Sequence, residues 1–350
     1  MNKLPKQMLL VCVCLFALTV QATADSLADA KRAYDQGNYA KAAKLFRPVA
    51  KQGNAQAQSM LGFMYYLGQG VPQDYKEALK WFQLAATQGD AGAQAKLGFM
   101  YINGQGAPQD YKEALNWSLL AANKGNALAQ FNLGTMYDSG TGVPRDYIEA
   151  IKWYLLASNQ GVALAQFRVG FLYDNGPGAS QDYKEAVKWY QLAAENGIAI
   201  AQFNLGMMYD IGKGVPQDYA EAIKWYRLAA KQGDALAQYK VGFLYGNGSG
   251  VPLDYTEAVK WYRLAAEQGN AEAQANLGLM YKNGQGAPQD FVLAYMWTNI
   301  AADNAPAHEL QRISSNRDSI TESMTPQQIA EAKELARTCT ANKFKGCKRE

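Results

Sequence analysis

Residues 57–89 read AQSMLGFMYYLGQGVPQDYKEALKWFQLAATQG, and closely similar stretches recur six more times along the chain. The tryptophans mark the period. All seven tryptophans of the sequence are spaced by 36 residues: Trp81, Trp117, Trp153, Trp189, Trp225, Trp261 and Trp297. A fixed period of this length predicts an array of repeats, each of which is one small supersecondary unit.

Each copy reads as two helices. Apolar residues at helical spacing predict a first helix over residues 55–67, and the Gly-x-Gly-Val-Pro segment 68–72 ends it. Asp74 is then the expected N-cap of a second helix, with Glu77 three residues later in a capping-box pattern, and Gly89 closes the copy. A single hairpin of this size cannot bury its own apolar face, so neighbouring copies must stack.

The pattern AQxxLGxxYxxGxGVPxDYxEAxxWxxxAAxxG resembles the Sel-one-like repeat, a relative of the tetratricopeptide repeat. The resemblance implies an all-α, α/α superhelical solenoid of stacked helix-turn-helix units. It also implies binding of partner proteins, whereas a fold alone does not fix an activity.

The expected organisation follows from where the period starts and stops. It comprises a signal peptide (1–24), a tetratricopeptide-like capping hairpin (25–53), seven repeats (54–89, 90–125, 126–161, 162–197, 198–233, 234–269, 270–305), C-terminal capping helices (306–338) and a basic tail (339–350). The last repeat and both ends depart from the consensus, as terminal repeats do.

The N-terminus has the three regions of a secretory signal. Lys3 and Lys6 precede an apolar run over residues 8–20, and Ala22-Thr23-Ala24 forms a small-x-small cleavage site. The run is shorter than the roughly 20 residues that span a bilayer. We therefore expect an exported protein, periplasmic or secreted, without a membrane span after cleavage. Loss of the two lysines lowers the net charge from +3 to +1, which gives no electrostatic footprint for nucleic acid.

Two cysteines are left after cleavage, Cys339 and Cys347. In an oxidising compartment they can form a disulfide that ties the tail; the alternative is two free thiols. We do not expect a zinc site here, because the sequence has no second cysteine pair or nearby histidine to complete the ligands.

No catalytic constellation is recognisable. The single histidine, His308, lies in the C-terminal cap, and no set of unlike groups converges on one site. The recurring aspartates are expected as helix N-caps rather than calcium or catalytic residues, and the recurring tryptophans as core. We expect neither a cofactor nor a metal.

A partner-binding surface is predicted on the first helices, at positions −5, −2, +2 and +5 from the Leu or Val before the glycine. The candidate residues are Phe131, Phe167, Phe203 and Tyr239 at −2, Phe171 and Phe243 at +2, and Asp138, Asp174 and Asp210 at +5. One interpretation is a concave groove for a peptide, with the acids favouring a basic or amide-rich ligand. The other is that the −2 and −5 side chains pack against the next repeat.

Three functions stay open. The first is a non-catalytic scaffold or adaptor of the bacterial envelope, acting on envelope, signalling or host proteins. The second is penicillin binding or β-lactamase activity, which the resemblance to cysteine-rich relatives implies, although those relatives carry cysteines in each repeat. The third is binding of peptidoglycan or another glycan.

Overall fold

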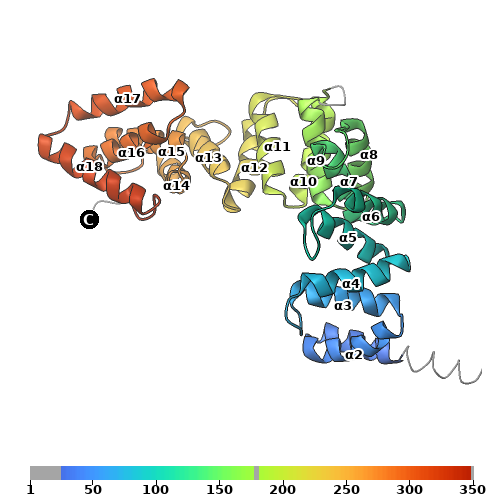
Figure 1. Ribbon diagram of the computed structural model, residues 1–350. Coiled ribbons are helices and arrows are strands. Elements are labelled where there is room, and N and C mark those ends of the chain that lie inside the picture. The colour runs from blue at the N-terminus through green and yellow to red at the C-terminus, as the bar shows by residue number, and fades with distance from the viewer. Residues whose placement is uncertain (1–24, 177–180, 348–350) are drawn as a thin grey trace, which may run out of the picture. The chain divides into compact units, whose positions relative to one another are not determined.

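The computed structural model describes residues 25–176 and 181–347, and these are built of helices without a β-strand (Figure 1). The predicted signal peptide lies outside the described residues. The chain divides into two compact units, residues 1–165 and 166–350, and each is described by itself. Among the described helices, none is both long and apolar enough to cross a membrane.

The first unit begins with helical residues 25–35 and continues in pairs of antiparallel helices. Its helices are α2 (Tyr39–Lys51), α3 (Ala55–Leu67), α4 (Tyr75–Thr87), α5 (Ala91–Asn103), α6 (Tyr111–Asn123), α7 (Ala127–Ser139) and α8 (Tyr147–Ser158). The predicted bounds of the first helix of the quoted repeat, 55–67, are those of α3.

The second unit repeats this arrangement and adds two C-terminal helices. Its helices are α9 (Ala163–Asn175, which crosses the division), α10 (Tyr183–Glu195), α11 (Ala199–Ile211), α12 (Tyr219–Lys231), α13 (Ala235–Asn247), α14 (Tyr255–Ala266), α15 (Ala271–Asn283), α16 (Phe291–Asn304), α17 (Ala307–Thr321) and α18 (Pro326–Ala341). Both α17 and α18 pack on α16. The helix α18 runs three residues past the predicted boundary at 338. The molecule is thus an all-α helical repeat solenoid.

The start of each second helix is fixed by an aspartate. Asp74 Oδ1 accepts hydrogen bonds from the backbone N–H groups of Lys76 at 2.9 Å and Glu77 at 3.1 Å. The capping-box prediction for Glu77 is wrong, because the N–H of Asp74 is already donated to the carbonyl of Tyr65. The Glu77 carboxylate instead pairs with Lys80 Nζ at 2.5 Å, one turn along the helix. Among the first helices, α11 has no side-chain cap, because Ile198 stands at its N-cap position.

The Gly-x-Gly loop holds consecutive repeats together. Gly68 ends α3 in the left-handed conformation. A Cβ on Gly70 would lie 2.2 Å from the carbonyl carbon of Tyr39, at the start of the preceding second helix. The second glycine is therefore required by contact between neighbouring repeats, and not only by its backbone angles.

A buried glutamine of the first helix links three helices at four of the junctions. Gln202 of α11 donates from Nε2 to the carbonyl of Ala194 in α10 at 3.0 Å, and its Oε1 accepts from Gln232 Nε2, just after α12, at 2.8 Å. Gln58, Gln130 and Gln238 make the same two bonds. In the second repeat, Gln94 donates to Ala86, but its buried Oε1 has no partner in the described part of the chain.

The core prediction for tryptophan is only partly right. The first six tryptophans are partly buried, and Trp297 alone among the seven is fully buried. The buried ring of the second helix belongs to the residue after the tryptophan, as in Tyr154, Tyr190 and Tyr226, which are 0% exposed. Five of the partly buried tryptophans instead cover the edge of a neighbouring apolar cluster, as Trp225 does for the cluster that contains Ala201 and Leu205.

We predict that Gln202→Met lowers the free energy of unfolding more than Gln94→Met. The first change removes two hydrogen bonds of about 0.5–1.5 kcal/mol each. The second removes one bond and also an unpartnered buried oxygen, so its cost is below about 1 kcal/mol. Urea unfolding followed by circular dichroism measures both variants. Equal losses would contradict the linking role of the glutamine.

Candidate functional site

The predicted −2 aromatics lie against the second helix of their own repeat. In the first unit, the Phe131 ring centroid is 5.6 Å from that of Tyr154. In the second unit the corresponding pairs are Phe167 with Tyr190 at 5.9 Å, Phe203 with Tyr226 at 5.6 Å and Tyr239 with Tyr262 at 6.0 Å. Phe167 is only 9% exposed. These rings cover the buried tyrosines and have a clear packing role.

The predicted acidic residues have partners inside the protein. Asp210 Oδ2 accepts from the Tyr226 hydroxyl at 3.0 Å and from Lys240 Nζ of the next repeat at 3.0 Å. Asp174 likewise accepts from Tyr190 at 3.3 Å and from Lys213 at 2.7 Å. These two side chains are 13% and 19% exposed. Their charges are largely used within the fold, which weakens the expectation of a basic ligand.

Asp138 has the equivalent place in the first unit, where its Oδ2 accepts from the Tyr154 hydroxyl at 3.2 Å. In the second unit the tyrosine hydroxyls respond to these surroundings. Burial, and secondly the charge of Asp210, raise the pKa of Tyr226 well above its ordinary value. The hydroxyl therefore stays protonated and donates to the carboxylate.

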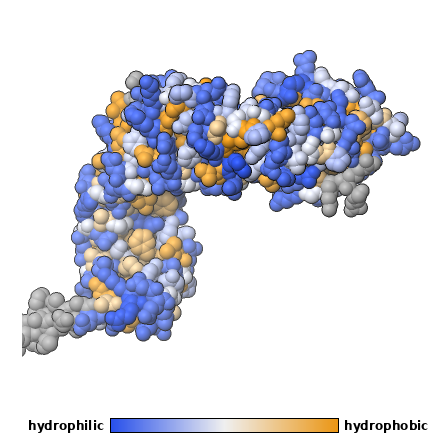
Figure 2. All heavy atoms as spheres, turned by 180° about the vertical axis from the view of Figure 1, so that it is seen from behind, coloured by the Kyte–Doolittle hydropathy of each residue, from blue (hydrophilic) through white to orange (hydrophobic). Residues whose placement is uncertain are grey.

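Larger apolar side chains stay exposed on the first helices of the second unit. We call five of them the first-helix strip: Phe171 of α9, Ile200 and Met207 of α11, and Leu236 and Phe243 of α13. Phe171 and Phe243, both predicted site residues, are 38% and 41% exposed. In the space-filling view, apolar residues reach the surface among hydrophilic ones (Figure 2).

The strip ends where α17 covers α15. Arg312 of α17 binds the Glu272 carboxylate at 2.9 Å, and Lys282 Nζ donates to Ser319 Oγ at 2.8 Å. Ile313 of α17 is buried in one cluster with Ala275. On α15, the C-terminal cap therefore covers the face that is exposed as the strip on α9, α11 and α13.

A second apolar surface was missed by the sequence reasoning. The second helices carry an exposed leucine three residues after each of the first six tryptophans, which we call the outer column: Leu84, Leu120, Leu156, Leu192, Leu228 and Leu264. In the last repeat the same position is Ile300, which is buried in one cluster with Ala332 and Ala336 of α18. Looking for positions that change between repeats overlooks a column that is constant. The signal was an apolar residue among polar ones at the same exposed helical phase.

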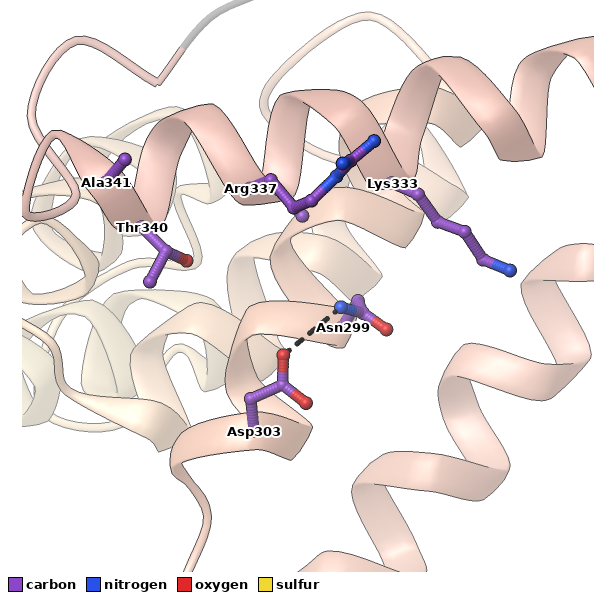
Figure 3. A pocket seen from close by; sticks show the side chains of 7 residues that line it. Asn299, Asp303, Lys333, Arg337, Thr340 and Ala341 are labelled. Atoms are coloured by element: carbon purple, nitrogen blue, oxygen red, sulfur yellow. Dashed lines mark hydrogen bonds between the residues drawn. The ribbon is translucent and has the colours of Figure 1, made fainter.

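A hollow of about 700 Å³ lies between α16 and α18. Asn299 and Asp303 of α16 line it together with Lys333, Arg337 and Thr340 of α18 (Figure 3). Asn299 Nδ2 donates to Asp303 at 3.4 Å, and Arg337 pairs with Glu334. His308 does not line it. In the described ranges there is also no group of three or more His, Cys, Asp or Glu residues that could hold a metal ion.

The tail is tied to this end of the molecule. Cys339 of α18 forms a disulfide with Cys347, with their Cα atoms 5.2 Å apart. Cys339 is buried, and Cys347 packs against the same apolar cluster. The bond therefore holds residues 339–347 against α16 and α18 rather than closing a ligand site.

We predict that Asp210→Ala destabilises the fold by about 1–3 kcal/mol, because the buried Tyr226 hydroxyl and Lys240 lose their acceptor. Leu236→Ala, on the same face but exposed, is the control and should change stability by less than about 0.5 kcal/mol. Urea unfolding curves compare the two. An unchanged curve for Asp210→Ala would leave this carboxylate free for a ligand.

The chain was compared with a set of protein-family models and with known proteins. The Sel1 repeat model matches residues 30–54, 55–90, 91–126, 127–162, 163–198, 199–234, 235–270 and 271–306. The first match, 30–54, covers most of the segment 25–53 predicted as a capping hairpin and the first residue of the next repeat. No curated protein matches the chain.

Two solved structures are similar over most of the chain. A Sel1 repeat protein from Oxalobacter formigenes is 35% identical, with a TM-score of 0.62, over 86% of this chain and 90% of its own. A protective antigen of uropathogenic Escherichia coli strains that displays an SLR fold is 26% identical, with a TM-score of 0.55, over 95% and 96%. The matches to the Sel1 repeat model run from residue 30 to residue 306, which is well over half of the chain. The chain therefore belongs to the Sel1 repeat family.

Proposed function

We propose that the chain is a non-catalytic adaptor of the bacterial envelope that binds a partner protein through the first-helix strip. Sel1 repeats commonly form protein-interaction scaffolds. The observation that carries the proposal is that the strip exposes large apolar side chains on three consecutive first helices. Exposed apolar side chains that recur on one face are typical of interaction sites.

Side-chain chemistry supports protein binding more than the other two functions. The Asp side chains nearest the strip are occupied by tyrosine and lysine partners, so they are poorly placed for catalysis. Cysteines are absent from the repeats, unlike in the cysteine-rich relatives that suggested β-lactamase or penicillin-binding activity. The −2 rings on which a glycan would stack pack against buried second-helix tyrosines, which leaves less of their surface for a sugar.

We predict that replacing Phe171, Met207 and Phe243 together with serine abolishes capture of the partner from the envelope fraction of the producing bacterium. These side chains are 36–41% exposed, so the fold should survive, as circular dichroism would verify. Quantitative mass spectrometry of proteins captured by wild type and variant gives the readout.

The matched control replaces Leu192, Leu228 and Leu264 of the outer column with serine, which removes three equally exposed side chains from the same unit. We expect the control to retain the partner. Loss with the control and retention with the strip variant would move the binding surface to the second helices. Turnover of nitrocefin, or retention on purified peptidoglycan in place of a protein, would favour the alternative functions.

Export is the other part of the proposal, and it rests on residues 1–24. We predict that the mature chain begins at Asp25, because the small residues at 22 and 24 precede that bond. N-terminal sequencing of the protein from the periplasmic fraction and the culture medium measures this directly. A cytoplasmic chain that still begins at Met1 would show that the segment is not a signal.

A further inference from the structure

Lys96 of α5 is surrounded by aromatic rings. Its Nζ lies 4.1 Å from the ring centroid of Tyr66, 5.2 Å from that of Phe99 and 5.6 Å from that of Phe63. The side chain is partly buried. Ring faces attract a cation, but they accept none of the three N–H bonds as a carboxylate does.

The same repeat position in the second unit shows what Lys96 lacks. Lys240, like Lys96, lies two residues before the glycine of its first helix, and it pairs with Asp210, thirty residues earlier. Thirty residues before Lys96 stands Tyr66. Within the described residues no carboxylate forms an ion pair with Lys96, and burial lowers the pKa of its ammonium. A partly buried cation without a counter-charge favours an anionic ligand.

A hollow of about 200 Å³ lies between α5 and α7; Lys96 does not line it, but Phe99 belongs both to its wall and to the rings around Lys96. Its other walls include Ile102 of α5 and Phe131 and Met136 of α7. Pockets for small-molecule ligands usually measure about 300–1,000 Å³. The hollow is smaller and mainly apolar, which suits a single apolar side chain.

The polar atoms that are still unpaired here are donors. Asn132 lines the hollow, and its buried Nδ2 has no hydrogen-bond partner in the described part of the molecule. Thr135, in contrast, donates to the carbonyl of Phe131 and accepts from Tyr154. Asn132 occupies in α7 the position that Lys96 occupies in α5. An occupant must therefore bring acceptors and negative charge.

We propose that this site binds an acidic peptide segment of a partner protein, with an Asp or Glu carboxylate on Lys96, a neighbouring apolar side chain in the hollow and a carbonyl oxygen on Asn132 Nδ2. The proposal rests on the proposed protein-binding function and adds a site on the first unit with its own ligand chemistry. An acidic ligand differs from the basic or amide-rich ligand that the sequence analysis favoured.

Selection from a phage-displayed library of random peptides on the purified chain 25–350 tests the proposal. We expect enriched peptides to place Asp or Glu beside Leu, Ile, Met or Phe. One such peptide, labelled with fluorescein, is then titrated by fluorescence anisotropy. Replacing its acidic residue with the amide should weaken binding at least about tenfold, since a charge-assisted hydrogen bond is lost. Added salt should weaken binding as well.

The decisive variant is Lys96→Met, which keeps an apolar stem among the rings but removes the charge. Its affinity for the acidic peptide should fall at least about tenfold, whereas Lys96→Arg should keep the affinity of the wild type. Lys240→Met is the matched control, because it removes a lysine from the same repeat position in the second unit. This control should bind the peptide like the wild type. Thermal unfolding confirms that all three variants are folded.

Several results would overturn the proposal. They are a selection without acidic bias, no enriched peptide, or acidic peptides that bind Lys96→Met as tightly as the wild type. If peptides without acids are enriched and their binding depends on Phe171 and Phe243, the proposed function stands while this site fails. If acidic peptides bind through Lys96 but the strip variant still captures its partner, the strip is wrong and the site stands.

Discussion

The buried amide of the first-helix glutamine is the constraint from which the rest of the array follows. Gln202 binds the end of one second helix and the end of the next, so its position fixes three helices at once. Where the buried amide is satisfied on both its oxygen and its nitrogen, as in Gln202, it leaves little freedom in how consecutive hairpins stack. The glycine at the loop adds a steric condition, because the loop backbone must touch the start of the preceding second helix.

With stacking fixed by constant residues, the variable positions are free to differ, but they do not vary independently. Where the −2 residue is a large ring, as in Phe203, the second helix offers a buried tyrosine such as Tyr226. Where the −2 residue is Ala95 or Ala275, the second helix carries the small side chains Ser118 and Thr298. Part of the variation between repeats is therefore a paired change of side chains that pack on each other, and it carries no information about a ligand.

This coupling explains which features the sequence could predict. Helix bounds such as 55–67 depend on Gly, Pro and Asp residues that end or cap helices. These residues lie next to the helix in the sequence, so the bounds can be predicted from it. The role of Asp210 depends on Tyr226 and Lys240, which lie 16 and 30 residues away. A helical wheel drawn for one helix contains neither contact. Neighbouring helices also decide how exposed a side chain is. The partly buried tryptophans were therefore assigned to the core, and the outer column was missed.

Reading pairs of positions rather than single positions would have separated packing from binding. A basic residue at Lys240 or Lys96 has the same helical phase, and only the residue thirty positions earlier tells them apart: Asp210 in one case and Tyr66 in the other. Exchange of that earlier residue turns a cation that joins two repeats into one that lacks a partner. In an array of near-identical units, a binding site can thus arise where an internal partner is missing, without any new functional group. Candidate binding sites are therefore repeat positions whose residues form an ion pair in other repeats but lack the partner residue in one repeat.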